Sequence, residues 1–286
     1  MKHIYLNLKR FDIRPAHGGV NRLAPMEEWG GTIVARTQEA LRAYSPKQAE
    51  FVMYLPEAHL LGAARAQMAN SPIRLGCQGV HWADTQPGGN FGAFTTFRTA
   101  HAALELGCES VLIGHCEERG GKAEILAEAG VAGPQASRAV CGLLNREIRA
   151  AQRAGLSVLY CIGEKSEEQG HWQETLAAQL DLGLDGVDKS RVVVAYEPVW
   201  SIGPGKKPAD RDYIQKIARF VKSHAPGLEL VYGGGLKAEN AAMLASIPEV
   251  DGGLIALTRF SGEIGFYPEE YLEIIRLYLG GEGEKA

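Results

Sequence analysis

The sequence lacks any long hydrophobic run, since none of its apolar stretches approaches the roughly 18 residues that a membrane span requires. It also lacks a surplus of one charge. With 30 Lys and Arg against 34 Asp and Glu, no global field favours nucleic acid or an anionic membrane as a partner. The first residues, MKHIYLNLK, carry no apolar signal segment. We therefore expect a soluble, cytoplasmic protein that holds any anionic ligand at a local site.

Paired cysteines are absent too. The five cysteines are an odd number, and they include no C-x-x-C pair and no spacing typical of a metal site. They are Cys77, Cys108, Cys116, Cys141 and Cys161. We expect free thiols in a reducing compartment and no bound metal ion.

Short apolar runs alternate with helical segments along the whole chain. The predicted strands are His3–Lys9, Glu50–Leu55, Ile73–Val80, Ser110–His115, Ser157–Ile162, a run that starts at Val192 and brings Glu197 to its end, Glu229–Tyr232 and Gly253–Leu257. The predicted helices are Thr32–Ala43, His59–Ala69, Thr96–Leu106, Ala139–Ala154, His171–Leu182, Arg211–His224, Ala238–Ala245 and Pro268–Leu279. Continuous apolar strands separated by helices indicate a parallel sheet covered on its outer face. The sequence therefore predicts a single α/β domain over residues 1–286, a closed (β/α)8 barrel.

Three turn-rich stretches and the tail depart from this regular alternation. The first loop, Arg10–Gly31, and the third, His81–Phe94, are long and are expected to be extended loops. The stretch Gly120–Gln135 is predicted to be irregular. The tail 280–286 is rich in glycine and charge and is expected to be flexible.

Polar side chains gather where the predicted strands end, which is the functional face of such a barrel. They are Asn7, Lys9, His115 with Glu117, Glu197, and the glycines 233–235. A carboxylate, an imidazole and an ammonium at one mouth can support proton abstraction next to a carbonyl, with Glu197 as base, His115 as hydrogen-bond donor or proton shuttle, and Lys9 stabilising an enediolate. Taken singly, each has a plain structural alternative: a charge at a strand exit, a core histidine and a solvated rim lysine.

The segment after Glu197 has the composition of a hinged lid. Pro198 and Pro208 stiffen its two ends, and a Gly-Pro-Gly turn at 203–205 supplies a flexible tip. A candidate base thus stands directly before a loop that can close over bound substrate.

The chain resembles the triosephosphate isomerase family over nearly its whole length. The segments that carry the resemblance are AYEPVWSIGPGK at 195–206, GHCEER at 114–119, CIGE at 161–164, YGG at 232–234 followed by Asn240, VDG at 250–252, and NLK at 7–9, where Leu8 replaces the family's usual tryptophan. The resemblance implies a cofactor-independent isomerase of a small phosphorylated sugar. Its fold agrees with the barrel expected from the alternation of elements.

The resemblance also implies roles for the residues at the strand ends. Glu197 would be the catalytic base and His115, neutral at the start of a short helix, the electrophile. Lys9 and Asn7 would line the substrate. Glu117 would pair with Lys9 and orient it, or else would only compensate the helix dipole.

The family also implies contacts for the phosphate and a supporting residue. The lid would place the N–H of Gly203 on the substrate's phosphate, and closure would exclude water. Backbone N–H groups near Gly234, Gly235, Ala256 and Leu257 would hold the same phosphate. Tyr232, at the end of the seventh predicted strand, would support this wall.

The phosphate end is where the sequence departs from the family. Gly235 replaces a serine, and Ala256–Leu257 replace two consecutive glycines. Leu257 should push the anion outward or require a reshaped loop. Arg259 could compensate as a bidentate phosphate ligand, or it could be a solvated surface charge.

The expected subunit contact is altered as well. In the family, a glutamate at the tip of the third loop pairs with an arginine of the neighbouring subunit. Here Phe97 and Glu118 occupy those two positions. A homodimer remains expected, with an altered third-loop contact.

Two further readings of the function stay open from sequence alone. The altered phosphate end and long loops could belong to a paralogue that isomerises or epimerises another small ketose phosphate, such as a tetrulose phosphate. Outside the isomerases, the chain could be a non-catalytic barrel, or an aldolase that uses Lys9 as a Schiff base.

Overall fold

The protein folds into one closed barrel of eight parallel strands, in the order β1 to β8. The computed structural model describes residues 1–201, 206 and 208–280. The strands are β1 (Lys2–Asn7), β2 (Ala49–Leu55), β3 (Ile73–Cys77), β4 (Ser110–Ile113), β5 (Ser157–Ile162), β6 (Val192–Tyr196), β7 (Glu229–Tyr232) and β8 (Gly252–Ile255). The predicted (β/α)8 barrel is confirmed.

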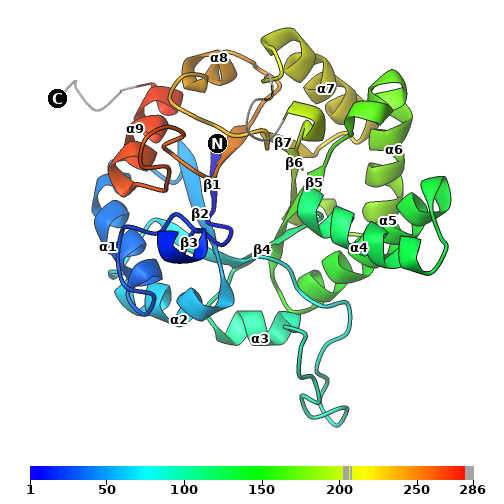
Figure 1. Cartoon of the computed structure of the whole chain (residues 1–286), viewed down its shortest axis with the longest axis horizontal. Coiled ribbons are helices and arrows are strands. Elements are labelled where there is room, and N and C mark those ends of the chain that lie inside the picture. The colour runs from blue at the N-terminus through cyan, green and yellow to red at the C-terminus, as the bar shows by residue number, and fades with distance from the viewer. Residues whose placement is uncertain (202–205, 207, 281–286) are drawn as a thin grey trace.

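The helices form a ring outside the strands, as Figure 1 shows. They are α1 (Trp29–Leu41), α2 (Glu57–Ala66), α3 (Ala100–Glu105), α4 (Cys116–Glu128), α5 (Gly133–Arg153), α6 (Trp172–Gly183), α7 (Arg211–His224), α8 (Ala241–Ala245) and α9 (Pro268–Leu279). None of these helices, within the described ranges, combines the length and apolarity needed to cross a membrane. The predicted tail lies outside the described residues from 281 onward.

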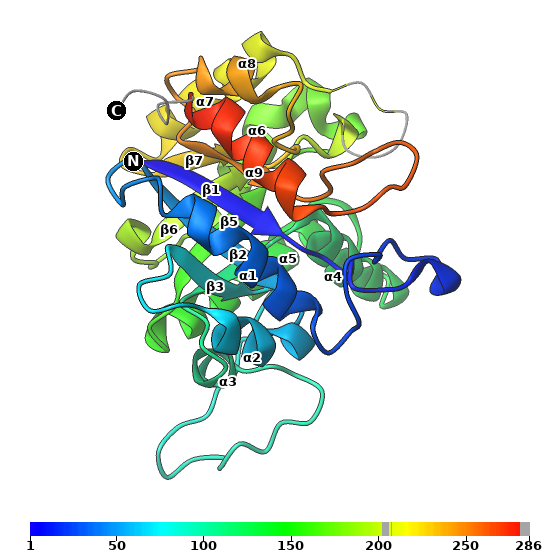
Figure 2. The same ribbon diagram turned by 90° about the vertical axis from the view of Figure 1, so that its left-hand side faces the viewer.

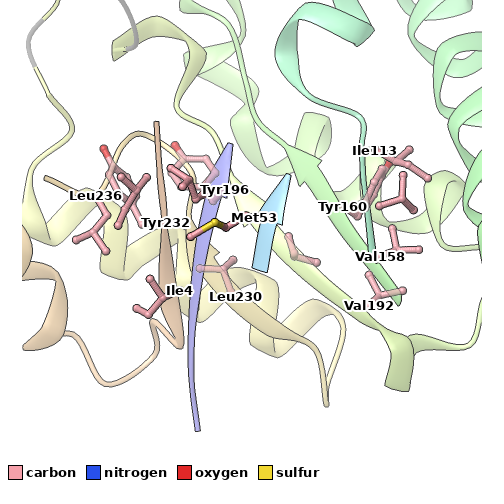
Figure 3. Packing of buried hydrophobic residues seen from close by; sticks show 14 of the residues in the cluster. Ile4, Met53, Ile113, Val158, Tyr160, Val192, Tyr196, Leu230, Tyr232 and Leu236 are labelled. Carbon is pink, nitrogen blue, oxygen red and sulfur yellow. The ribbon is translucent and has the colours of Figure 1, made fainter. Parts of the chain in front are cut away.

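Most of the hydrophobic core lies between the strands and the helices. Strand side chains that point outward, such as Ile4, Val158 and Leu230, are fully covered there, and Figure 3 shows part of this layer. A second cluster packs the barrel interior and includes Tyr54 and Leu159. Burial on both faces explains why the strands appear as continuous apolar runs in the sequence.

The stretch Gly120–Gln135, predicted to be irregular, is mostly helical. Residues 116–128 form α4, and α5 starts at Gly133, earlier than expected. The prediction failed because α4 contains Gly120 and Gly121 and has no fully buried residue, so it shows no apolar periodicity. Its first turn is capped by the His115 side chain, which accepts the N–H of Glu117.

The first and third loops are long, as predicted. Between β1 and α1 the described regular structure is a short 3₁₀ turn, Pro15–His17. This loop is held by the buried Asp12, whose Oδ2 lies 3.0 Å from His59 Nε2 and whose carbonyl accepts the Asn21 amide. The third loop, between β3 and α3, stands away from the barrel in Figure 2.

Barrel closure leaves no room for a side chain at Gly252, the first residue of β8. A Cβ atom there would lie 1.9 Å from the carbonyl oxygen of His3 on β1. We expect Gly252→Ala to lower the free energy of unfolding by about 2 kcal/mol or more, because neither backbone can yield without breaking the ladder. Urea unfolding followed by far-UV circular dichroism measures this change.

Gly142→Ala is the matched control for that substitution. Gly142 is exposed on α5, and a Cβ atom there would have no neighbour within 4 Å. The change should add about 0.5–1 kcal/mol through helix propensity. Equal unfolding midpoints for Gly252→Ala and the unmodified chain would contradict the closure argument.

Candidate active site

Glu197 follows the last residue of β6 and is buried, with 2% of its surface exposed. Its backbone N–H donates to the carbonyl of Ile162 on β5 at 2.8 Å, which continues the ladder one residue past the strand. Its carboxylate accepts the N–H of Cys116 at 2.9 Å through Oε2, and Oε1 lies 3.3 Å from Nε2 of His115. The structure therefore brings together two residues that the sequence placed on separate strand ends.

His115 is the N-cap residue of α4, and its ring orientation follows from that position. Nδ1 accepts the backbone N–H of Glu117 at 3.2 Å, so this nitrogen carries no proton. In the neutral ring the proton is then on Nε2, the atom that faces Glu197. The cap thus selects the tautomer that presents an N–H donor to the barrel mouth.

The environment moves the two pKa values in opposite directions. Burial raises the pKa of Glu197 to about 7, although the Cys116 N–H and the charges of Lys9 and Arg119 act the other way. Burial and the charge of Lys9 lower the pKa of His115 to about 4, against the opposing influence of Glu118. Near neutral pH the imidazole is therefore uncharged, and the carboxylate can both take and return a proton.

Lys9 lies just beyond β1 with a backbone φ of 38°, a conformation that L-residues rarely adopt. Its N–H donates to Asn7 Oδ1 at 3.1 Å. The amide of Gln78 donates to Asn7 Oδ1 and to the carbonyl of Lys9, each at 3.2 Å. Gln78 therefore holds Lys9 and Asn7 together.

Sequence reasoning missed Gln78. The predicted third strand ran to Val80, so Gln78 was expected inside it. In the structure Gln78 lies directly after β3, where the strand-end rule that selected Asn7 and Glu197 would have found it.

The Glu117–Lys9 pairing that the resemblance implies is not seen among the described residues. Both residues are described, and no ion pair joins them within the described part of the chain. Glu117 lies in the first turn of α4, where its N–H is held by His115 while its side chain is exposed. The alternative, compensation of the helix dipole, agrees with this position.

Glu164, at the end of β5, ties the start of the lid to the barrel. It is fully buried, and its Oε1 accepts three hydrogen bonds, from Tyr196 at 2.8 Å, Trp200 at 2.7 Å and Tyr213 at 2.9 Å. Trp200 belongs to the first shoulder of the predicted lid. Gly203, the expected phosphate contact at its tip, lies outside the described residues.

The wall expected to bind phosphate requires glycine at two positions. A Cβ atom at Gly233 would lie 2.8 Å from Glu197 Cγ, and one at Gly234 would lie 2.3 Å from the hydroxyl of Tyr232. Tyr232 is buried, and burial raises its pKa to about 12, so it stays neutral. Gly235 has a φ of 99°, which a serine there would adopt only with strain.

The neighbouring strand β8 ends at Ile255 and is followed by half-buried side chains at Ala256 and Leu257. Arg259 is engaged elsewhere. Its Nε donates to Glu270 Oε1 at 2.8 Å and its guanidinium lies 3.8 Å from the Tyr267 ring centroid. Arg259 is therefore partly exposed and paired with Glu270 of α9, which is neither of the two roles left open for it.

One group of side chains at the mouth has the donor types of a metal site. Ligand atoms of His115, Cys116 and Glu197 all lie within 4.8 Å of one another. The ammonium of Lys9 acts electrostatically on each of them, which opposes the binding of a cation. The Cys116 thiol also has its pKa raised to about 11 by burial and Glu197, so it is protonated at neutral pH. The described cysteines are free.

Comparison with known proteins gives consistent matches. The family model described as triosephosphate isomerase matches residues 28–276. A triosephosphate isomerase from Synechococcus sp. (strain JA-2-3B'a(2-13)) is 32% identical over 81% of this chain and 82% of its own length. One from Nostoc punctiforme is 30% identical over 86% of this chain and 93% of its own. The crystal structure of triosephosphate isomerase from Bartonella henselae superposes with a TM-score of 0.68 and 26% identity, covering 97% of this chain and 98% of that one.

Proposed function

Since this chain belongs to the triosephosphate isomerase family of intramolecular oxidoreductases, we propose that it interconverts glyceraldehyde 3-phosphate and dihydroxyacetone phosphate without a cofactor. The observation that carries this proposal is the 3.3 Å approach of the neutral His115 Nε2 to the Glu197 carboxylate at the barrel mouth. A base and a hydrogen-bond donor at that spacing can act on adjacent atoms of one small substrate.

In the proposed reaction Glu197 takes a proton from the carbon next to the carbonyl. The electrons of the broken C–H bond form the C=C bond of an enediolate, and the former carbonyl oxygen gains negative charge. His115 donates its Nε2–H to that oxygen, and Lys9 stabilises the charge. Glu197 then returns the proton to the neighbouring carbon. To reach substrate, the carboxylate must exchange its contact with the Cys116 N–H for the carbon atom.

One observation supports a different substrate: the half-buried Leu257 lies at the wall expected to bind the phosphate. This residue supports the alternative of a four-carbon ketose phosphate, whose phosphate would lie farther out. A panel of triose and tetrulose phosphates, compared by kcat/KM, decides between the two. Triose turnover several orders below the diffusional ceiling of about 10⁸ M⁻¹s⁻¹ would argue against the triose assignment.

The variant Leu257→Gly sharpens this comparison. If the triose is the substrate, the smaller residue should leave or improve its kcat/KM. If a tetrulose phosphate is the substrate, the change should lower kcat/KM for the tetrulose and raise it for the triose.

The pH dependence of the reaction follows from the two shifted groups. The base must be ionised, so kcat/KM should rise with pH up to about 7, the raised pKa of Glu197. The pKa of His115 is lowered to about 4, so no limb should appear at the ordinary histidine pKa of 6.5. The substrate's phosphate ester ionises at about pH 6, so its ionisation should appear in the pH profile below the step at about pH 7 that belongs to Glu197. A rate that falls as the pH rises through 7 would contradict the assignment.

We propose further that the protein is a cytoplasmic homodimer that docks through its third loop. Support comes from Phe97, which stacks on His81 with ring centroids 4.1 Å apart yet keeps 55% of its surface exposed, and from Phe91, which is 90% exposed. Sedimentation equilibrium should give a dimer for the unmodified chain and a weaker dimer for Phe97→Asp. A monomer at all concentrations for the unmodified chain would refute this contact.

A further inference from the structure

Gly114, the residue before His115, has both of its backbone polar groups held by side chains of α4. Its N–H donates to Oε2 of Glu118 at 2.6 Å, and its carbonyl accepts from Nε of Arg119 at 2.9 Å. Gly114 has a φ of 82°, and a Cβ atom there would lie 2.9 Å from the Cys161 carbonyl oxygen. The turn that delivers His115 is therefore set by the first turn of the helix that follows it.

Glu118 is itself held from behind by Lys122 and Glu147. The Lys122 ammonium contacts Glu118 Oε1 one helical turn away and lies 3.1 Å from Glu147 Oε1 on α5. The side chain of Glu147 is only 4% exposed and that of Lys122 only 17%. These three residues, Glu118, Lys122 and Glu147, are called the anchor cluster below.

The charge of Lys122 keeps Glu118 in its ionised form. Burial opposes ionisation, but Lys122 and the Gly114 N–H outweigh it and lower the pKa of Glu118. Burial and the charge of Glu118 raise the pKa of Glu147, which therefore takes up the proton of the pair. An ionised acceptor gives a shorter and stronger bond to a backbone N–H than a neutral one.

We propose that Glu118 is a positioning residue for His115, and that the anchor cluster holds the Gly114–His115 turn so that Nε2 of His115 meets the reacting oxygen. This inference rests on the proposed role of His115 as hydrogen-bond donor. The Glu117 N–H that selects the His115 tautomer lies next to Glu118 in the first turn of α4, directly after the Gly114–His115 turn. Releasing Gly114 therefore disturbs both the place and the protonated atom of the ring.

The first test compares Glu118→Ala with Glu118→Gln, which keeps an acceptor oxygen at the same reach. Misplacement of a reacting group by about 1 Å can cost about 10²-fold in rate. We expect Glu118→Ala to lower kcat by about 10- to 100-fold with KM unchanged within about twofold, because His115 acts mainly in the transition state. Glu118→Gln should recover kcat to within about fivefold, since a neutral acceptor is weaker.

Glu128→Ala is the matched control, an exposed glutamate in the last turn of the same helix. It should leave kcat unchanged. Lys122→Met should lower kcat in the same direction as Glu118→Ala, and Lys122→Arg should restore it. If Glu118→Ala does not fold, the Lys122 pair and Glu118→Gln carry the test. A folded Glu118→Ala or Lys122→Met variant with the kcat of the unmodified chain would overturn the proposal.

A spectroscopic measurement tests this inference independently of the proposed function. The ¹⁵N resonances of the His115 ring report which nitrogen carries the proton, whatever substrate the protein uses. They should shift in Glu118→Ala, return in Glu118→Gln and stay fixed in Glu128→Ala. Unshifted resonances in Glu118→Ala refute the positioning role. Absence of isomerase activity in the unmodified chain refutes the proposed function alone.

Discussion

Replacing Glu197 by glutamine will lower kcat by about 10³-fold or more, while KM changes little. Glutamine has the same shape and keeps an oxygen that can accept the Cys116 N–H, now 2.9 Å away, so the site should stay assembled. It cannot take a proton, however, and every turnover needs that step. Steady-state kinetics on the preferred substrate measures the loss, with the exposed Glu167→Gln as a control that should retain full activity.

The same substitution should make the protein more stable at alkaline pH. The folded pKa of Glu197 is about 7 against an ordinary value of 4.5, so between these values the folded state binds the proton more tightly than the unfolded state does. Stability due to this group therefore falls as the pH rises from 4.5 to 7 and stays low above it. The penalty is on the order of 3 kcal/mol for a shift of this size in a buried group.

Glutamine carries no such penalty. Urea unfolding at pH 8 should show Glu197→Gln to be the more stable protein, and at pH 4 the two should be equal. A variant that is both inactive and less stable at pH 8 would indicate that Glu197 supports the fold and was misassigned as the base.

Replacing His115 by glutamine will lower kcat by about 10²- to 10³-fold, the usual effect of losing one preorganised donor to a developing oxyanion. The amide can point an N–H toward the mouth, but it lacks the Nδ1 acceptor that fixes the ring against the Glu117 N–H at 3.2 Å. The donor is then neither fixed in place nor matched to the oxygen. Kinetics together with exchange of substrate hydrogen into heavy water measure the two halves of the reaction.

The double variant Glu197→Gln, His115→Gln tests whether the two residues act in the same step. The two residues act on one intermediate and lie 3.3 Å apart, so their effects should not add. The double variant should lose little more than Glu197→Gln alone. Losses that multiply fully, or a His115→Gln variant within threefold of the unmodified chain, would contradict a shared step.

The barrel could be predicted from sequence because its strands are buried on both faces. β5 (Ser157–Ile162) and β7 (Glu229–Tyr232) match the predicted ranges, since each is a compact apolar run bounded by polar or turn residues. β3 was predicted to reach Val80 but ends at Cys77, where its pairing with β2 stops. The chain then turns through Gly79, which has a φ of 107°. The helix α4 was missed because polar caps and charges specify it, with no apolar stripe.

The residues of the candidate site could also be predicted from the sequence, but some of the contacts between them could not. Glu197, His115 and Lys9 each follow a strand, and parallel strands end on one face of the barrel. The pairing of Glu117 with Lys9, which the resemblance implied, is absent from the ion pairs of the described residues, because the Glu117 side chain is exposed in the first turn of α4. Gln78 was missed because the predicted third strand ran to Val80, which placed Gln78 inside the strand, whereas β3 ends at Cys77.

Order and identity of residues along the chain were therefore enough to determine the alternation of elements, the closed barrel and the strand-end chemistry. Protonation states and orientations depended on contacts between residues remote in sequence, such as Cys116 and Glu197, which are 81 positions apart. A pKa is set by burial and by neighbouring charges, and a tautomer by the bond at the other ring nitrogen. For this reason only the folded chain shows that burial raises the pKa of Glu197 to about 7, that burial and Lys9 keep His115 uncharged, and that Glu118 accepts the N–H of Gly114, the residue before His115.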